Sequence, residues 1–255
     1  MISYYLEVII LSVIQGVTEF IPVSSSAHLI IISNISDFNL NSLEVDVSLH
    51  LGSLLAIVVY FWRDLIDFSK NKKKLYLIFF GSIPLIIVGY VLYISNLIYH
   101  LRNLELIAWT TLIFGVLLYF SDKNKTDKIL EKDLSKKDII FIGMLQILSL
   151  IPGVSRSGIN ITAGRFVKYS RIDSAKISFF LSIPALAGAS LLGLKDILKD
   201  PFEFNSIIFL TISISFIFSY LTIKFLLYYL DKFSLKIFVF YRIILAFFLF
   251  AVIYF

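Results

Sequence analysis

The chain has 255 residues, of which 58% are hydrophobic and only 16% charged, with a formal net charge of +5 and no cysteine. Soluble domains carry charge at about a quarter of their positions, so this composition excludes an ordinary soluble domain and predicts a polytopic membrane protein. The lack of cysteine excludes disulfides, thiol catalysis and thiolate metal sites. Nucleic acid is not an expected partner, because Lys and Arg lie mainly between apolar runs, where membrane insertion places them.

The first apolar segment, at about 4–33, is interrupted near its middle by Pro22 and three serines. This pattern predicts a helix-loop-helix hairpin that enters the membrane and returns on the same side. Non-helical backbone at that depth must be buried in protein or line a cavity. A second segment of the same design lies at about 139–164.

Six further apolar runs are continuous, and each has close to the roughly 20 residues that a helix needs to cross a bilayer. They predict spans at about 44–62, 75–95, 104–120, 174–194, 204–225 and 236–254. The expected fold is therefore an all-α polytopic membrane protein that forms a single integral membrane domain over residues 1–255.

The loop charges predict how these elements are oriented. If neither hairpin crosses the membrane, four loops share one face and carry 5, 6, 4 and 3 basic residues: Arg63 to Lys74, Lys123 to Lys137, Arg165 to Lys176 and Lys224 to Lys236. The other face keeps only Arg102, Lys195 and Lys199, so the first face is expected in the cytoplasm. Each half then has one re-entrant hairpin and three spans, which predicts an inverted-topology repeat of about 1–121 and about 138–255.

Both interrupted segments contain a short polar motif: QGVTEFIPVSSSAH at 15–28 and QILSLIPGVSRSG at 146–158. Such polar groups are costly against lipid, so we expect both motifs to meet in one cavity. Backbone N–H groups at a helix start bind phosphate oxygens, and a guanidinium adds a forked donor. The candidate phosphate-binding residues are Ser24, Ser26, Gly153, Ser155, Ser157 and Gly158, with Arg156 as the charged donor. Serines in membrane helices also bond their own backbone or join helices, and this alternative stays open.

Four side chains are candidates for catalysis: Glu19, Ser25, His28 and Arg156. An intramembrane Glu is expensive and indicates function, and Glu19 could ligate a divalent cation, act as a base or pair with Arg156. Gln15 precedes Glu19 by one helical turn, so both side chains share a helix face, and Gln15 is the candidate second ligand of a cation held by Glu19. His28 follows Ser25 by three residues, within reach to bond it or to protonate a leaving phosphate.

On these motifs the chain resembles the undecaprenyl pyrophosphate phosphatases of the bacitracin-resistance (BacA-like) family. The matching residues are Gln15 with Glu19, Pro22 to Ser25 with His28, and Pro152 to Gly158, and the likeness extends through Asp46 to Asp64 and Ser178 to Pro184. The resemblance implies hydrolysis of undecaprenyl pyrophosphate to the monophosphate carrier, and a divalent cation, Mg²⁺ or Ca²⁺. It also implies a bacterial plasma membrane location, with the site on the periplasmic or outer side.

This sequence departs from the family pattern at three positions. Gln15 stands where many members have Glu, which weakens any scheme with two carboxylates on a metal. His50 stands where Gln is common, and Lys176 where Glu is often found, although Lys176 is expected near the end of its span. A flippase or transporter for a polyprenyl phosphate remains the alternative function, and the nucleophile is either Ser25 or a water activated by Glu19. The oligomeric state, with a homodimer as one option, is not determined by the sequence.

Overall fold

The computed structural model of the chain describes residues 2–36, 43–70, 72–197 and 206–254. Six of its helices are long and apolar enough to cross a membrane: α3 (Leu43–Tyr60), α5 (Lys72–Ile94), α6 (Leu104–Asp122), α10 (Arg171–Ile197), α11 (Ser206–Lys232) and α12 (Lys236–Tyr254). The predicted all-α fold with six spans is confirmed. Helix α11 runs beyond its predicted end at 225, because Leu226 and Leu230 continue its buried face.

The two interrupted segments form the predicted helix-loop-helix hairpins. Hairpin 1 consists of α1 (Ile2–Thr18), a turn at 19–24 and α2 (Ser25–Ser36). Hairpin 2 consists of α8 (Lys136–Gln146), the 3₁₀ turn η2 (Ile147–Leu150), a loop and α9 (Arg156–Phe166). The second helix of each starts after a serine with positive φ: Ser24 (76°) accepts a hydrogen bond from the Ala27 N–H, and Ser155 (70°) accepts one from the Gly158 N–H. A serine hydroxyl thus satisfies an N–H of each first turn, as expected of an N-cap.

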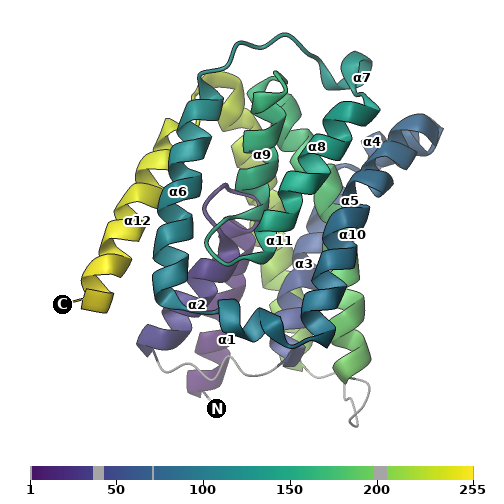
Figure 1. The fold of residues 1–255 in the computed structure, drawn as a ribbon. Helices are drawn as coiled ribbons and strands as arrows, with labels where there is room; N and C mark the ends of the chain where they lie inside the picture. Colours follow the sequence, from purple (N-terminus) through teal and green to yellow (C-terminus); the bar gives the residue numbers. More distant parts are fainter. Residues whose placement is uncertain (1, 37–42, 71, 198–205, 255) are drawn as a thin grey trace.

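The hairpins enter the bundle from opposite ends, and their turns meet near its middle (Figure 1). Two hydrogen bonds join the turns: the Gly153 N–H donates to Ser24 Oγ at 3.3 Å, and Ser157 Oγ donates to the Ile21 carbonyl at 2.8 Å. The predicted convergence of both motifs is therefore observed. The relation of the two halves as inverted copies, and their boundaries, remain predictions.

Three short helices complete the described chain: α4 (Trp62–Lys70), η1 (Leu97–Leu101) and α7 (Leu130–Asp133). Helices α4 and α7 lie at the same end as the open end of hairpin 2, whereas the N-terminus and hairpin 1 lie at the other (Figure 1). The loops predicted to share the basic face thus gather at one end of the molecule.

Close backbone contacts hold span α3 against span α11 and dock hairpin 2 against α5. Helix α11 packs on α1 and α3, and α8 packs on α5. A Cβ at Gly52 would lie 2.6 Å from the Ile212 carbonyl oxygen, and one at Gly143 would lie 2.2 Å from that of Gly81. Glycine is required at these positions, since membrane helices gain stability from close packing rather than from hydrophobic burial.

Large apolar side chains cover the outside of the bundle. Phe79, Phe209, Phe240, Ile244 and Phe247 are each at least 60% exposed. An apolar surface of this extent is unsuited to water and is the surface that a lipid environment covers.

Candidate active site

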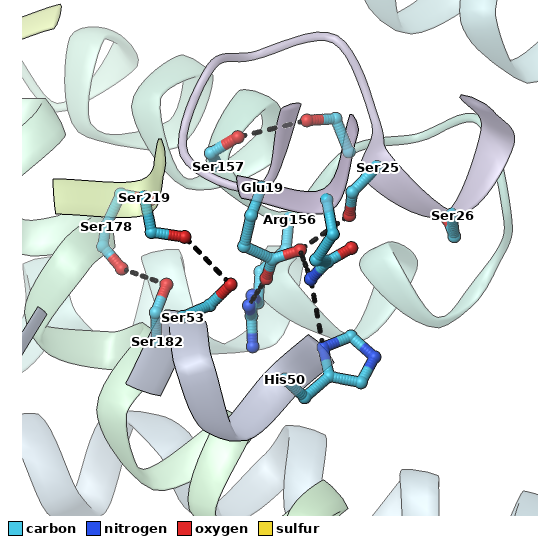
Figure 2. Close-up of polar contacts among 12 residues, drawn as sticks. Glu19, Ser25, Ser26, His50, Ser53, Arg156, Ser157, Ser178, Ser182 and Ser219 are labelled. Atoms are coloured by element: carbon cyan, nitrogen blue, oxygen red, sulfur yellow. Dashed lines mark hydrogen bonds and ion pairs between the residues drawn. The ribbon is translucent and has the colours of Figure 1, made fainter. Parts of the chain in front are cut away.

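An ion pair between the two hairpins forms the centre of the site (Figure 2). Glu19, in the turn that follows α1, accepts a hydrogen bond from Nη2 of Arg156, the first residue of α9. Their side chains are 5% and 16% exposed, so both charges are largely removed from solvent. The predicted partnership of Glu19 with Arg156 is thus formed across 137 residues of sequence.

Two more donors hold the Glu19 carboxylate. Ser25 Oγ donates to Oε2 at 2.6 Å, and Gln15 Nε2 donates to the same oxygen at 2.9 Å. Ser25 is partly exposed, whereas Gln15 is fully buried. A hydroxyl that donates to a carboxylate held by other groups is the arrangement of a nucleophile with its base.

His50, on α3, joins the site through Gln15. Its Nδ1 lies 3.2 Å from Gln15 Nε2. The amide nitrogen also donates to Glu19, and its second N–H can donate to Nδ1 when the ring proton is on Nε2. Sequence reasoning had noted His50 only as a departure from a family pattern, because nothing in the local sequence connects α3 with α1.

His28 occupies a different position from the one expected. Its Nδ1 donates to the Ser24 carbonyl at 2.7 Å, and its Nε2 bonds the hydroxyl of Tyr241 on α12. The two rings also stack, with centroids 5.6 Å apart. The imidazole therefore bonds Ser24 and Tyr241 in place of the Ser25 hydroxyl, which donates to Glu19.

The remaining serines of the motifs connect the turns. Ser24 and Ser155 act as N-caps, Ser157 bonds hairpin 1, and Ser155 Oγ lies 3.1 Å from Ser157 Oγ. Only Ser26 is exposed. The role in helix packing that the sequence left open therefore accounts for most of these hydroxyls, and the backbone of α9 is left as the candidate phosphate-binding feature.

The start of α9 offers that backbone. A helix start leaves its first N–H groups without intrahelical partners, and the partial positive charge there favours anions. The Gly158 N–H is taken by Ser155, and no protein acceptor lies within bonding distance of the Arg156 and Ser157 N–H groups in the described part of the chain. Gly153 shapes the turn with φ 89°, and a Cβ there would lie 2.1 Å from Thr110 Oγ1.

A charged residue that sequence reasoning missed lies directly behind this turn. Arg242 of α12 is fully buried and donates to the carbonyls of Pro22, Gly153 and Val154 and, through Nε, to that of Thr111. A signal was present, because an arginine inside a predicted span is costly and indicates function. Its partners in both motifs were beyond the reach of local spacing.

A group of serines lies beside the ion pair (Figure 2). Ser53 of α3 has its Oγ 3.0 Å from that of Ser219 and 3.3 Å from that of Ser215, both on α11. Ser182 of α10 donates to the Ser178 carbonyl. All five are buried; the Ser53 contacts join α3 to α11, whereas the Ser182 bond lies within α10.

Only part of a cation site is provided by the protein. The described residues contain no cluster of three or more His, Cys, Asp or Glu side chains that could hold a metal. Gln15 Oε1, however, is buried without a partner next to Glu19. One carboxylate and one amide oxygen do not make a calcium cage, but they fit Mg²⁺, which keeps several waters and binds substrate phosphates.

Comparison with known proteins agrees with these features. Residues 8–248 match the family described as Bacitracin resistance protein BacA. A Pelagibacter ubique protein named undecaprenyl-diphosphatase is 56% identical over the full length of both chains. Proteins of the same name from Elusimicrobium minutum (40% identical, 93% of this chain and 94% of the relative) and Erythrobacter litoralis (34%, 96% and 99%) also match. With its six apolar helices, the chain is a multi-pass bacterial membrane protein, and it belongs to the bacitracin resistance protein BacA family.

Proposed function

We propose that this chain hydrolyses undecaprenyl diphosphate to undecaprenyl phosphate and inorganic phosphate. The names of full-length relatives support this substrate. The observation that carries the proposal is the contact of a serine–carboxylate pair, Ser25 and Glu19, with a guanidinium at a helix start. The Glu19 side chain thus contacts both the candidate nucleophile, Ser25, and the anion-binding residue, Arg156.

Binding of the diphosphate begins with Arg156. A diphosphate oxygen replaces Glu19 as the partner of the guanidinium, and the Arg156 and Ser157 N–H groups donate to further oxygens. The terminal phosphorus then faces hairpin 1 and the Ser25 hydroxyl. Fixed donors of this kind stabilise the charge that develops on the oxygens during phosphoryl transfer.

Ser25 is the proposed nucleophile. Its Oγ forms a bond to the terminal phosphorus while the P–O bond to the bridging oxygen breaks, and undecaprenyl phosphate leaves. Glu19, 2.6 Å away, takes the hydroxyl proton. After Glu19 has passed this proton to the departing undecaprenyl phosphate, it takes a proton from a water. The water oxygen bonds the phosphorus while the Ser25 Oγ–P bond breaks, Glu19 returns the proton to Ser25 Oγ, and phosphate leaves. In the alternative, Glu19 activates a water directly and Ser25 only binds phosphate.

A divalent cation fits this scheme as an additional component. Glu19 and the unpartnered Gln15 Oε1 would hold Mg²⁺, or Ca²⁺ with more water, together with the diphosphate. When bound, the cation neutralises part of the charge of the diphosphate.

The proposed orientation places the open end of hairpin 1 outside and the basic loops in the cytoplasm, following the loop charges. Cysteines introduced at Ser95 and Lys125, which are both exposed, test it on a chain without native thiols. In right-side-out vesicles, an impermeant thiol reagent should label the Ser95 position, and the Lys125 position only after permeabilisation. The reverse pattern would put the site on the cytoplasmic side.

Phosphate release by the purified protein in detergent tests the function, because without two compartments a flippase has no measurable output. Arg156→Lys keeps the charge but loses the fork and should lower kcat/KM by about two to three orders of magnitude. The matched control is Arg63→Lys. Arg63 is an exposed arginine of α4 at one end of the molecule, away from the site, so this variant should retain activity. Wild-type protein that releases no phosphate, or an Arg156→Lys variant as active as the control, would contradict the proposal.

A further inference from the structure

Arg242 is buried among backbone carbonyls without a counter-ion. Its side chain has no solvent exposure, and no carboxylate forms an ion pair with it in the described part of the chain. Burying an unpaired charge is strongly unfavourable unless hydrogen bonds and a later counter-charge offset it. Four N–H···O contacts of 2.8–3.3 Å supply the hydrogen bonds.

The acceptors of Arg242 come from both motif turns. Nη1 donates to Pro22 of hairpin 1 and to Val154 of hairpin 2, and Nη2 donates to Gly153. The C=O and N–H of a trans peptide point in opposite directions, and no cis peptide occurs in the described residues. With the Val154 carbonyl turned toward α12, the N–H of Ser155, the residue before α9, points away from Arg242.

Glycines on two neighbouring helices leave room for this side chain. A Cβ at Gly158 would lie 3.0 Å from Arg242 Nη1, and a Cβ at Gly115 would lie 3.1 Å from Arg242 Cβ. Ser155, on the turn that Arg242 bonds, has a φ of 70°, which costs free energy in a residue other than glycine, whereas Gly153 adopts its φ of 89° without strain. The contacts with Arg242 compensate for this unfavourable backbone.

We infer that Arg242 is a positioning residue for the diphosphate site, an inference that rests on the proposed function. Its guanidinium fixes the two turns relative to each other, and thereby the spacing between Ser25 and the N–H groups at the start of α9. It also places a positive charge on the side of this turn opposite to the diphosphate. The bound diphosphate supplies the negative charge that balances it. Arg242 touches no reacting atom in this arrangement.

The test compares Arg242 with a matched residue, Arg165. Arg165 is also buried and also donates to backbone carbonyls, those of Asp122, Asn124 and Tyr169, but at the far end of α9. Gln and Lys variants of each arginine are purified in detergent. Four quantities are measured: the Tm, the KM and the kcat for undecaprenyl diphosphate, and the Kd for inorganic diphosphate.

Arg242→Gln should raise KM and the Kd for inorganic diphosphate by about tenfold to a hundredfold, since it removes both the charge and its carbonyl bonds. Arg242→Lys retains the charge with fewer hydrogen bonds, so its KM and Kd should lie between those of Arg242→Gln and wild type. The Lys variant also provides the test if the Gln variant does not fold. Arg165→Gln and Arg165→Lys should lower Tm with KM and Kd within twofold of wild type. The Kd does not depend on turnover, so a wild-type protein without phosphatase activity would refute the proposed function and still test Arg242.

Two results would overturn the inference. One is wild-type Kd and KM in a folded Arg242 variant. The other is an equal loss of diphosphate affinity in the Arg165 variants, which would mean that any buried arginine of this bundle acts through stability alone.

Discussion

Removal of the negative charge at Glu19 should affect binding and catalysis in opposite directions. Glu19 is the partner of Arg156 in the structure described here, so a diphosphate must displace it. A hydrogen bond to a charged group contributes about 1.5–3 kcal/mol, which corresponds to roughly 10- to 150-fold in an equilibrium constant. Glu19→Gln keeps the shape of the side chain and should tighten binding of inorganic diphosphate by up to that factor.

Turnover of the same variant should fall by about two to four orders of magnitude, because an amide cannot accept the proton of Ser25 or of a water. Binding is measured by calorimetry in excess chelator, so that loss of a cation ligand does not mask the competition. Glu105→Gln, at an exposed carboxylate of α6 that bonds Tyr254, is the control and should match wild type in both assays. Weaker or unchanged diphosphate binding by Glu19→Gln in chelator would refute the competition between Glu19 and substrate.

Three further variants test separate parts of the site and fold. Ser25→Ala should abolish a covalent phosphoenzyme and nearly all turnover if Ser25 is the nucleophile; a loss of only about tenfold to a hundredfold, without trapped enzyme, would favour the water mechanism. Gln15→Glu puts a second carboxylate where Gln15 Nε2 lies, 2.9 Å from Glu19. The two negative charges should lower the Tm of the variant in chelator, and added Mg²⁺ should raise its Tm by more than it raises that of wild type. An equal rise in Tm for both proteins would argue against a cation at this position. Tyr169→Phe removes a 3.0 Å hydrogen bond to Asp138 and should destabilise the protein by about 1–3 kcal/mol near pH 7, with activity retained. Burial, and next the bond to Asp138, raise the pKa of Tyr169. The stabilisation by this bond is therefore complete below the unfolded-state pKa near 10 and is lost as the pH rises beyond it. The Tm of the Phe variant should fall less than that of wild type over this alkaline range.

The spans and hairpins were predictable because their signals are local. An uninterrupted apolar run has one stable solution in lipid, and Pro22 followed by serines breaks such a run. The meeting of the two motifs followed from the re-entrant layout, since two turns that enter from opposite faces reach the same depth; pairing with Arg156 was one of three roles open to Glu19. These steps need only the order and polarity of residues along the chain.

Contacts set by the rotation of one helix against another were not predictable. His28 was expected beside Ser25 from a spacing of three residues, but α2 starts at Ser25 and turns the ring toward Tyr241, 213 residues away. His50 and Arg242 reach the site from α3 and α12 in the same way. Which face of a span meets a turn depends on close packing at glycines such as Gly52, and a single sequence does not specify that register.

The contact between Arg242 and hairpin 1 also has a consequence for biosynthesis. Pro22 and Arg242 are separated by 220 residues, and ribosomes add about 5–20 residues per second. The turn that carries Glu19 is therefore made roughly 10–40 s before the guanidinium that fixes it, and α11, against which α1 packs, is also among the last segments made. During this interval hairpin 1 lacks the contacts that Glu19 makes with Arg156, Ser24 with Gly153 and Pro22 with Arg242, so we expect its insertion to depend on an insertion factor and the turn to be open to quality-control proteases when translation stops early.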